Sequence, residues 1–310
     1  MKKILIIKHG ALGDIILSLY AIHSIKNHFK ISEITVLTEE KYADIFLNLK
    51  SIDKIIVDNR PKIFLSYQFI KLFVWFHKSN FDWIFDLQTS FRTKIYFKIF
   101  SIFKKFNWNG IEKKCSHPHL DANRKRLHTK ERHKKQLEKA GIKSIEKIDW
   151  SFLDTDINNF KLPYQYVILV PGGSFKRPEK RWKIKNFIEI IQYLSKKNLF
   201  SVLVGGEDEL EKFKSINFKN FNCYNLVGKT NFVQLAALSR RASLILGNDT
   251  GPMHLLSECS KKSIKKIVLF GSGSDPKLCA PVAENVMILK RKSINDISPN
   301  EIKNIILKNI

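Results

Sequence analysis

Cysteine is scarce in this sequence of 310 residues, and its spacing argues against whole classes of site. The cysteines are widely scattered and include no CxxC pair; they are Cys115, Cys223, Cys259 and Cys279. This spacing speaks against a disulfide framework and against a zinc site, and it is typical of reduced thiols inside a cell. We therefore expect a cytoplasmic protein that holds no metal ion.

Long apolar runs are also missing. The longest, residues 63–76, is interrupted by Lys71 and is shorter than the roughly 20 residues that a membrane-spanning helix needs. The first three residues, MKK, lead into too few apolar residues before Lys8 for a secretory signal. We therefore expect any contact with a membrane to be peripheral.

Negative charge is in short supply. The sequence has 29 Asp and Glu against 54 Lys and Arg, which gives a formal net charge of +25. Residues 92–147 concentrate the excess, with 17 Lys and Arg against 5 Asp and Glu. Such a balance favours anionic partners, among them nucleic acid, a membrane surface or a phosphorylated substrate.

Two common nucleotide-binding fingerprints are absent. Gly10 and Gly13 are spaced as GxxG, whereas a dinucleotide-binding turn needs GxGxxG. The P-loop pattern GxxxxGK[ST] does not occur either. These absences disfavour an NAD site and a P-loop nucleotidase.

The sequence does contain an alternation of β and α patterns, and the alternation occurs twice. A near-continuous apolar run at residues 3–10 predicts a buried parallel strand, and apolar spacing of three and four then predicts a helix. The pattern restarts at residues 166–173 after a stretch rich in Lys and Arg. Further strands are predicted at residues 33–38, 54–58, 81–87, 201–206, 223–228, 242–249 and 266–273.

This alternation predicts an α/β protein with two doubly wound, Rossmann-like domains and a cleft between them. We expect the first domain to span residues 1–155 and the second to span residues 156–310. Ligands of such folds bind at the carboxyl ends of the strands. The informative turns are therefore GALGD (10–14), PGGSFKRPEKRW (171–182), GNDTGP (247–252) and FGSGSDP (270–276).

The turn GNDTGP has the composition of an open helix N-terminus. Asp249 is a good N-cap, Pro252 suits the first helical turn, and Gly251 leaves the backbone N–H groups unobstructed. A helix N-terminus of this kind attracts a diphosphate. A plain capped helix with His254 packed against the sheet explains the residues equally well, so chemistry alone leaves both readings open.

Residues 8–26 (KHGALGDIILSLYAIHSIK), together with residues 246–255 (LGNDTGPMHL), resemble the ADP-heptose:lipopolysaccharide heptosyltransferases. These enzymes form glycosyltransferase family 9 and have the two-domain GT-B architecture. Residues 86–93, 171–182, 226–238 and 269–276 follow in the family order, so the resemblance spans essentially the whole chain. It implies inverting transfer of heptose from ADP-heptose to a sugar hydroxyl of the lipopolysaccharide inner core, without a cofactor.

The resemblance also implies roles for single residues. Asp14 is then the general base; the alternative is that it only caps its helix. Lys180 neutralises the departing diphosphate. The donor side further comprises Gly172, Gly173, Ser174, Asp249 as cap, Thr250 as hydroxyl, Gly251 as backbone donor, and His254 as either a phosphate contact or a packing residue.

The acceptor side falls on the basic first domain. The resemblance assigns to it Gly13, Arg92, Arg124, Lys125, His128 and Arg132. The implied acceptor is an anionic, lipid-linked sugar at the inner face of the cytoplasmic membrane. Residues 91–106 are aromatic and basic at once, which suits either a membrane surface or a helix that covers the sheet.

Two departures from the family pattern lie on this acceptor side. Thr89 stands where the family commonly has glycine, and residues 106–120 diverge. The remaining alternatives are a GT-B transferase that uses another nucleotide sugar for a capsule, O-antigen or protein glycan, and a basic nucleic-acid-binding protein. We expect no nucleic-acid partner, because the sequence carries no helix-turn-helix, RNA-binding or zinc signature.

Overall fold

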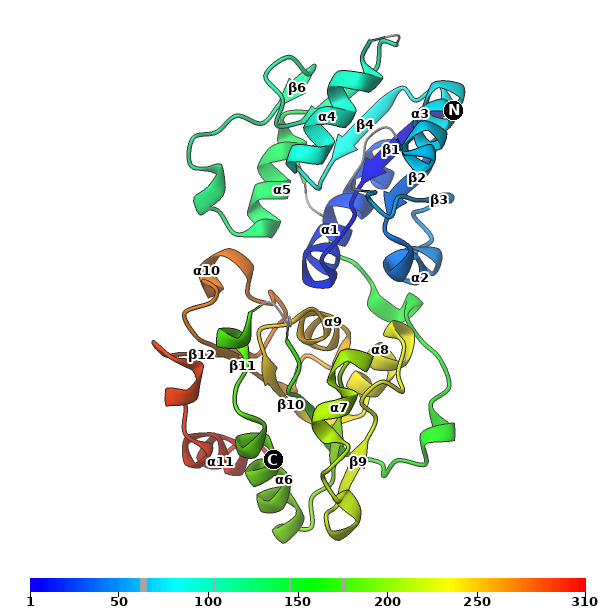
Figure 1. The fold of residues 1–310 in the computed structure, drawn as a ribbon. Helices are drawn as coiled ribbons and strands as arrows, with labels where there is room; N and C mark the ends of the chain where they lie inside the picture. The colour runs from blue at the N-terminus through cyan, green and yellow to red at the C-terminus, as the bar shows by residue number, and fades with distance from the viewer. Residues whose placement is uncertain (62–65, 103, 145, 174–176) are drawn as a thin grey trace. The chain divides into compact units, whose positions relative to one another are not determined.

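The computed structural model describes residues 1–310 except 62–65, 103, 145 and 174–176 (Figure 1). The chain divides into two compact units, Met1–Phe152 and Leu153–Ile310. Each unit contains one six-stranded sheet whose paired strands are all parallel. The predicted α/β class, with two doubly wound sheets, is therefore confirmed.

The first sheet has the strand order β3-β2-β1-β4-β5-β6. Its strands are β1 (Lys2–Ile7), β2 (Ser32–Thr38), β3 (Lys54–Val57), β4 (Trp83–Asp86), β5 (Asn107–Gly110) and β6 (His117–Pro118). Its helices are α1 (Leu12–His28), α2 (Ala43–Leu47), α3 (Tyr67–Ser79), α4 (Phe91–Phe100) and α5 (Thr129–Glu138). Ile7 is the register partner of both Leu37 and Asp86, so β1, β2 and β4 end close together.

Aromatic packing joins α3 and α4 on this sheet. The rings of Phe76 and Phe100 stack with their centroids 3.8 Å apart. Tyr96 and Phe97 are buried in the same core, whereas Phe91 at the start of α4 is exposed. Residues 91–106 were expected to form either a membrane surface or a helix that covers the sheet. The apolar face of α4 covers the sheet.

The second sheet has the strand order β12-β11-β10-β7-β8-β9. Its strands are β7 (Tyr166–Val170), β8 (Ser201–Leu203), β9 (Cys223–Asn225), β10 (Ala242–Asn248), β11 (Lys265–Phe270) and β12 (Val286–Lys290). Its helices are α6 (Ile184–Lys196), α7 (Leu210–Phe213), α8 (Phe232–Arg240), α9 (Gly251–Cys259), α10 (Pro276–Cys279) and α11 (Pro299–Leu307).

The central strands of both sheets are buried along most of their length, as parallel strands covered on both faces must be. Near the end of β10 the backbone approaches β7 closely. A Cβ atom on Gly247 would lie 2.5 Å from the Cβ of Val170, so only glycine fits this position. In the part of the chain that the structure describes, none of the helices is both long and apolar enough to cross a membrane.

Candidate active site

In the second unit, the turns that follow β7 and β10 lie beside each other, because Val170 and Gly247 are register partners in neighbouring strands. The buried side chain of Asn248 links them. Its amide nitrogen donates to the carbonyls of Pro171 and Gly172, at 2.8 and 3.0 Å, and its oxygen accepts from the backbone N–H of Trp182 at 3.2 Å. Asn248 thus fixes the shape of the predicted donor site, a role that the sequence analysis did not anticipate.

A short ion pair forms at the same edge of the sheet. The Nζ of Lys180 lies 2.6 Å from Oδ2 of Asp249, and both side chains are largely buried. The hydroxyl of Ser274, in the turn after β11, donates to the same carboxylate oxygen at 2.6 Å. Lys180 and Asp249 are therefore brought together as predicted, while Ser274 is an additional member of the cluster.

The prediction that Asp249 caps α9 is wrong. Thr250 is the N-cap of α9, and no side chain makes a capping hydrogen bond there. The carboxylate of Asp249 instead accepts from the ammonium of Lys180, in a hydrogen bond whose donor and acceptor are both ionised. Pro252 does lie in the first turn, as expected.

The open start of α9 retains unused hydrogen-bonding groups. The Oγ1 of Thr250 is buried and has no hydrogen-bond partner among the residues described. Gly251 begins the helix, whose first-turn amides no side chain caps. His254 is buried one turn further on, with Nε2 4.0 Å from Oδ1 of Asp249. The N-terminus of α9 therefore offers a hydroxyl and backbone donors at one place.

A buried carboxylate supports the glycine turn after β7. Oε1 of Glu209 accepts a hydrogen bond from the backbone N–H of Gly173 at 3.0 Å. A Cβ atom on Gly172 would collide with the same carboxylate, so a larger residue there would displace Glu209. Ser174, the third residue predicted in this turn, lies outside the described residues.

In the first unit, Asp14 lies in the first turn of α1, just beyond the end of β1. The N-cap of this helix is Ala11, so Asp14 does not cap it. The carboxylate is half-buried, and no group within the described ranges donates a hydrogen bond to it. Among these residues, its capacity to accept a hydrogen bond is therefore unused.

Two buried charged residues that the sequence analysis did not single out lie near Asp14. Lys8 follows β1, and its Nζ approaches the carbonyl of Leu87 at 3.5 Å, which is long for a hydrogen bond. Burial lowers the pKa of Lys8, and the nearby carboxylate of Asp14 opposes this shift. Burial also raises the pKa of Asp86, the last residue of β4, to about 6. The sequence signal that could have identified Lys8 and Asp86 is a charged residue at the end of a buried strand.

Two arginines of the basic segment join this cluster. Arg124 donates from Nη2 to the hydroxyl of Thr89 at 2.8 Å, and Arg132 donates to the hydroxyl of Thr129 at 2.8 Å. Burial, followed by repulsion from Arg132, lowers the pKa of Arg124 to about 10. The Nε of Arg124 is buried and lacks a hydrogen-bond partner in the described chain. The cluster thus has an excess of positive charge, since it holds Lys8, Arg124 and Arg132 against Asp14 and Asp86, and an anion would balance it.

Thr89 adopts a backbone conformation that favours glycine. Its φ is +47°, in the left-handed region that costs an L-residue roughly 1–2 kcal/mol. A threonine at this position therefore carries a conformational cost. The hydroxyl that Thr89 adds is the acceptor for Arg124, so the substitution also supplies a contact that glycine lacks.

The other residues assigned to the acceptor are less closely grouped. Lys125 is exposed, and the ring of His128 caps α5 by accepting from the N–H of Lys130 at 3.2 Å. Gly13 lies beside Asp14 in the first turn of α1. Arg92 belongs to a different cluster, because its guanidinium donates to the hydroxyl of Tyr96 at 3.1 Å.

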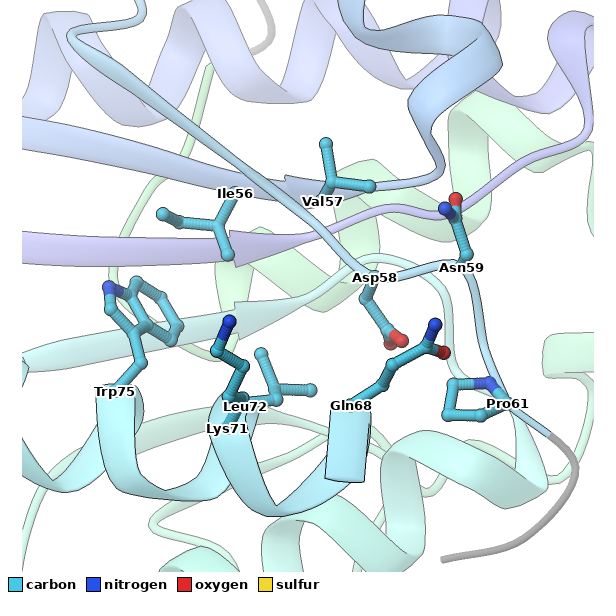
Figure 2. Close-up of a pocket in the computed structure, with 9 residues that line it drawn as sticks. All are labelled: Ile56, Val57, Asp58, Asn59, Pro61, Gln68, Lys71, Leu72 and Trp75. Carbon is cyan, nitrogen blue, oxygen red and sulfur yellow. The ribbon is translucent and has the colours of Figure 1, made fainter. Parts of the chain in front are cut away.

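That second cluster borders a cavity of about 370 Å³ between the end of β3 and α3 (Figure 2). The hydroxyl of Tyr96 donates to the buried carboxylate of Asp58, which also contacts Nε2 of His9 at 2.8 Å. Figure 2 shows Asp58 facing the cavity, with side chains of α3 opposite. The lining residues are Ile56, Val57, Asp58, Asn59, Pro61, Gln68, Lys71, Leu72 and Trp75.

Comparison with known proteins places these features in a family. The model of glycosyltransferase family 9 (heptosyltransferase) matches residues 70–305, which is more than half of the chain. Lipooligosaccharide heptosyltransferase 2 of Campylobacter jejuni is 23% identical over 94% of this chain and 94% of its own length. The lipopolysaccharide core heptosyltransferase OpsX of Haemophilus influenzae is 24% identical over 82% of this chain and 75% of its own length.

Solved structures show the same fold. A glycosyl transferase family 9 protein from Veillonella parvula has a TM-score of 0.81 at 21% identity and covers 99% of this chain and 96% of its own. E. coli heptosyltransferase WaaC with ADP has a TM-score of 0.77 at 19% identity and covers 99% of this chain and 100% of its own. The protein is thus a glycosyltransferase of the predicted architecture, and the chain belongs to glycosyltransferase family 9 (heptosyltransferase).

Proposed function

We propose that the protein transfers heptose from ADP-heptose to a sugar hydroxyl of the lipopolysaccharide inner core, with inversion at the anomeric carbon. The lipopolysaccharide core heptosyltransferase among its relatives supports the heptose and this acceptor, and the solved heptosyltransferase with ADP supports the nucleotide. The observation that carries the proposal is the carboxylate of Asp14, half-buried at the carboxyl end of β1 with no donor bound to it among the described residues. Such a group is suited to accept a proton.

The reaction is a single displacement. Asp14 takes the proton of the acceptor hydroxyl while the hydroxyl oxygen forms a bond to the anomeric carbon of the heptose. The bond from that carbon to the diphosphate breaks, and its electron pair leaves with ADP. Because attack and departure occur on opposite faces of the sugar, the configuration inverts. The general base and the leaving-group partner therefore act on different atoms.

The donor diphosphate binds at the edge of the second sheet. Lys180 supplies the cationic partner of the leaving group, and Asp249 positions its ammonium through the 2.6 Å contact. Thr250 supplies its hydroxyl, and the first-turn amides of α9, beginning with Gly251, supply backbone donors. The proposed donor side also includes Gly172, Gly173, Ser174 and His254.

The acceptor binds in the first unit through its negative groups. Arg124 and Arg132, both half-buried, provide the excess positive charge, and a carboxylate or phosphate of the inner core balances it. Gly13, Arg92, Lys125 and His128 complete the proposed acceptor side. Residues 1–155 thus form the acceptor-binding domain and residues 156–310 the donor-binding domain. The lipid-linked acceptor brings the enzyme to the inner face of the cytoplasmic membrane as a peripheral protein.

A thermal-shift panel of ADP, UDP, GDP and their sugars tests the donor assignment. We expect ADP and ADP-heptose to raise the melting temperature most, and Lys180→Ala to reduce that shift. A larger shift with UDP or GDP sugars would contradict the proposal and favour a GT-B transferase for another glycan. Retention on DNA without any response to nucleotide sugars would instead favour a nucleic-acid-binding protein.

A further inference from the structure

Helix α3 presents a row of apolar side chains to solvent. Tyr67, Ile70 and Val74 are 71%, 49% and 44% exposed. Their spacing of three and four residues places them on one face of the helix. The opposite face buries Phe69, Leu72 and Phe76 in the core, so α3 is apolar on both its inner and its outer side.

Basic residues accompany this row. Lys71 and Lys78 are exposed at positions four and eleven residues after Tyr67, and therefore project on the same side as the apolar row. The Nζ of Lys71 lies 5.1 Å from the ring centre of Tyr67. Residues 61–81 contain no Asp or Glu at all. We define the α3 outer face as Tyr67, Ile70, Lys71, Val74 and Lys78.

Apolar and cationic side chains on one helix face match an anionic lipid surface. The apolar groups enter the boundary between headgroups and acyl chains, while the lysines remain near the phosphates. A second copy of the chain is a poor occupant, since each copy carries a net charge of +25 and the two would repel each other. The same net charge attracts the protein to an anionic membrane.

We propose that the α3 outer face docks the enzyme on the anionic surface of a phospholipid bilayer. The proposal assigns the membrane contact to α3 and not to the apolar face of α4, whose Tyr96, Phe97 and Phe100 are buried. It identifies the surface through which the enzyme contacts the membrane in the peripheral location proposed above. It rests on the proposed function, because the lipid-linked acceptor is what the enzyme reaches at the membrane. The cavity of Figure 2 opens beside the same helix and shares Lys71 with the outer face.

Co-sedimentation of the full chain with vesicles tests the proposal without any substrate. The wild type should bind phosphatidylglycerol-containing vesicles, bind pure phosphatidylcholine vesicles weakly, and lose affinity at high salt. Lys71→Gln with Lys78→Gln should weaken binding by about fivefold per lysine. Ile70→Ser with Val74→Ser should weaken it roughly tenfold or more.

A matched control removes comparable exposed apolar groups elsewhere. Ile288→Ser with Leu307→Ser changes side chains that are 40% and 63% exposed in the second unit, and it should bind vesicles like the wild type. Equal loss in the control, or unchanged binding of both α3 variants, would overturn the proposal. So would a wild-type dimer, detected by light scattering, that Ile70→Ser with Val74→Ser dissociates.

Transfer to a water-soluble, delipidated acceptor separates this proposal from the proposed function. The α3 variants should keep wild-type turnover on that acceptor, because the outer face contributes no group to the chemistry. Normal transfer without vesicle binding would refute only the membrane surface. Vesicle binding that follows the prediction, without any transfer, would refute only the proposed reaction.

Discussion

The ion pair between Lys180 and Asp249 allows a quantitative test of how the donor site is held together. The two charges are 2.6 Å apart, and their side chains are only 12% and 5% exposed. Asp249→Ala leaves the ammonium buried without its carboxylate, which should lower the free energy of unfolding by about 3–5 kcal/mol. Lys180→Met removes the charge but keeps the alkyl packing, and leaves Asp249 with Ser274 as its remaining close hydroxyl partner.

The double variant removes both charges together. It should therefore be more stable than the sum of the single effects predicts, with a coupling energy of about 2–3 kcal/mol. Urea denaturation followed by far-ultraviolet circular dichroism suits the measurement, because tryptophan fluorescence would mix the signal of Trp182 with that of the four tryptophans in residues 1–152. A coupling energy below about 0.5 kcal/mol would refute the reasoning, since only a solvent-exposed pair is that weak.

Three further predictions concern single residues. Lys180→Ala should lower kcat with ADP-heptose by raising the activation free energy of transfer by about 2–4 kcal/mol, and unchanged kinetics in a folded variant would remove Lys180 from the mechanism. Thr89→Ala should be less stable in urea than Thr89→Gly by about 1 kcal/mol, because both lose the hydroxyl bound by Arg124 and only glycine adopts a positive φ without strain; equal stability would contradict this. Asp86 has a folded pKa of about 6 against 3.8 unfolded, so the folded state binds more protons between these values. The stability of the wild type relative to Asp86→Asn should then fall by about 2 kcal/mol as the pH rises from 4 to 6, and a flat difference would refute the assignment.

Local patterns carried most of the fold prediction. Continuous apolar runs followed by glycine turns and amphipathic stretches identified the strand–turn–helix units, and with them the placement of Asp14 in the first turn after β1. These features depend on neighbouring residues only, so periodicity reveals them. The ends of short strands such as β3 and β4 came out one or more residues shorter than predicted, because pairing with a neighbouring strand decides where a strand ends.

Contacts between distant residues escaped the same reasoning. Asp249 is a residue type that favours the N-cap position, but its carboxylate accepts a hydrogen bond from Lys180, which lies 69 positions earlier in the chain. Asn248 is read locally as a turn residue, yet its amide holds two turns together. The exposed face of α3 could not be predicted from the sequence either, because an apolar stretch does not reveal which of its side chains the core will cover.

Replacement of Asp14 by asparagine tests the central claim most directly, with Asp44→Asn as a matched control that removes a carboxylate from the first turn of α2. Neither residue is an N-cap, so both variants should change the free energy of unfolding by less than about 1 kcal/mol. Asp14→Asn should lower the rate of heptose transfer by roughly 10² to 10⁴, the usual contribution of a general base, while ADP-heptose affinity stays the same. Asp44→Asn should transfer at the wild-type rate. Transfer by Asp14→Asn at a rate close to that of Asp44→Asn would contradict the assignment of Asp14 as the base.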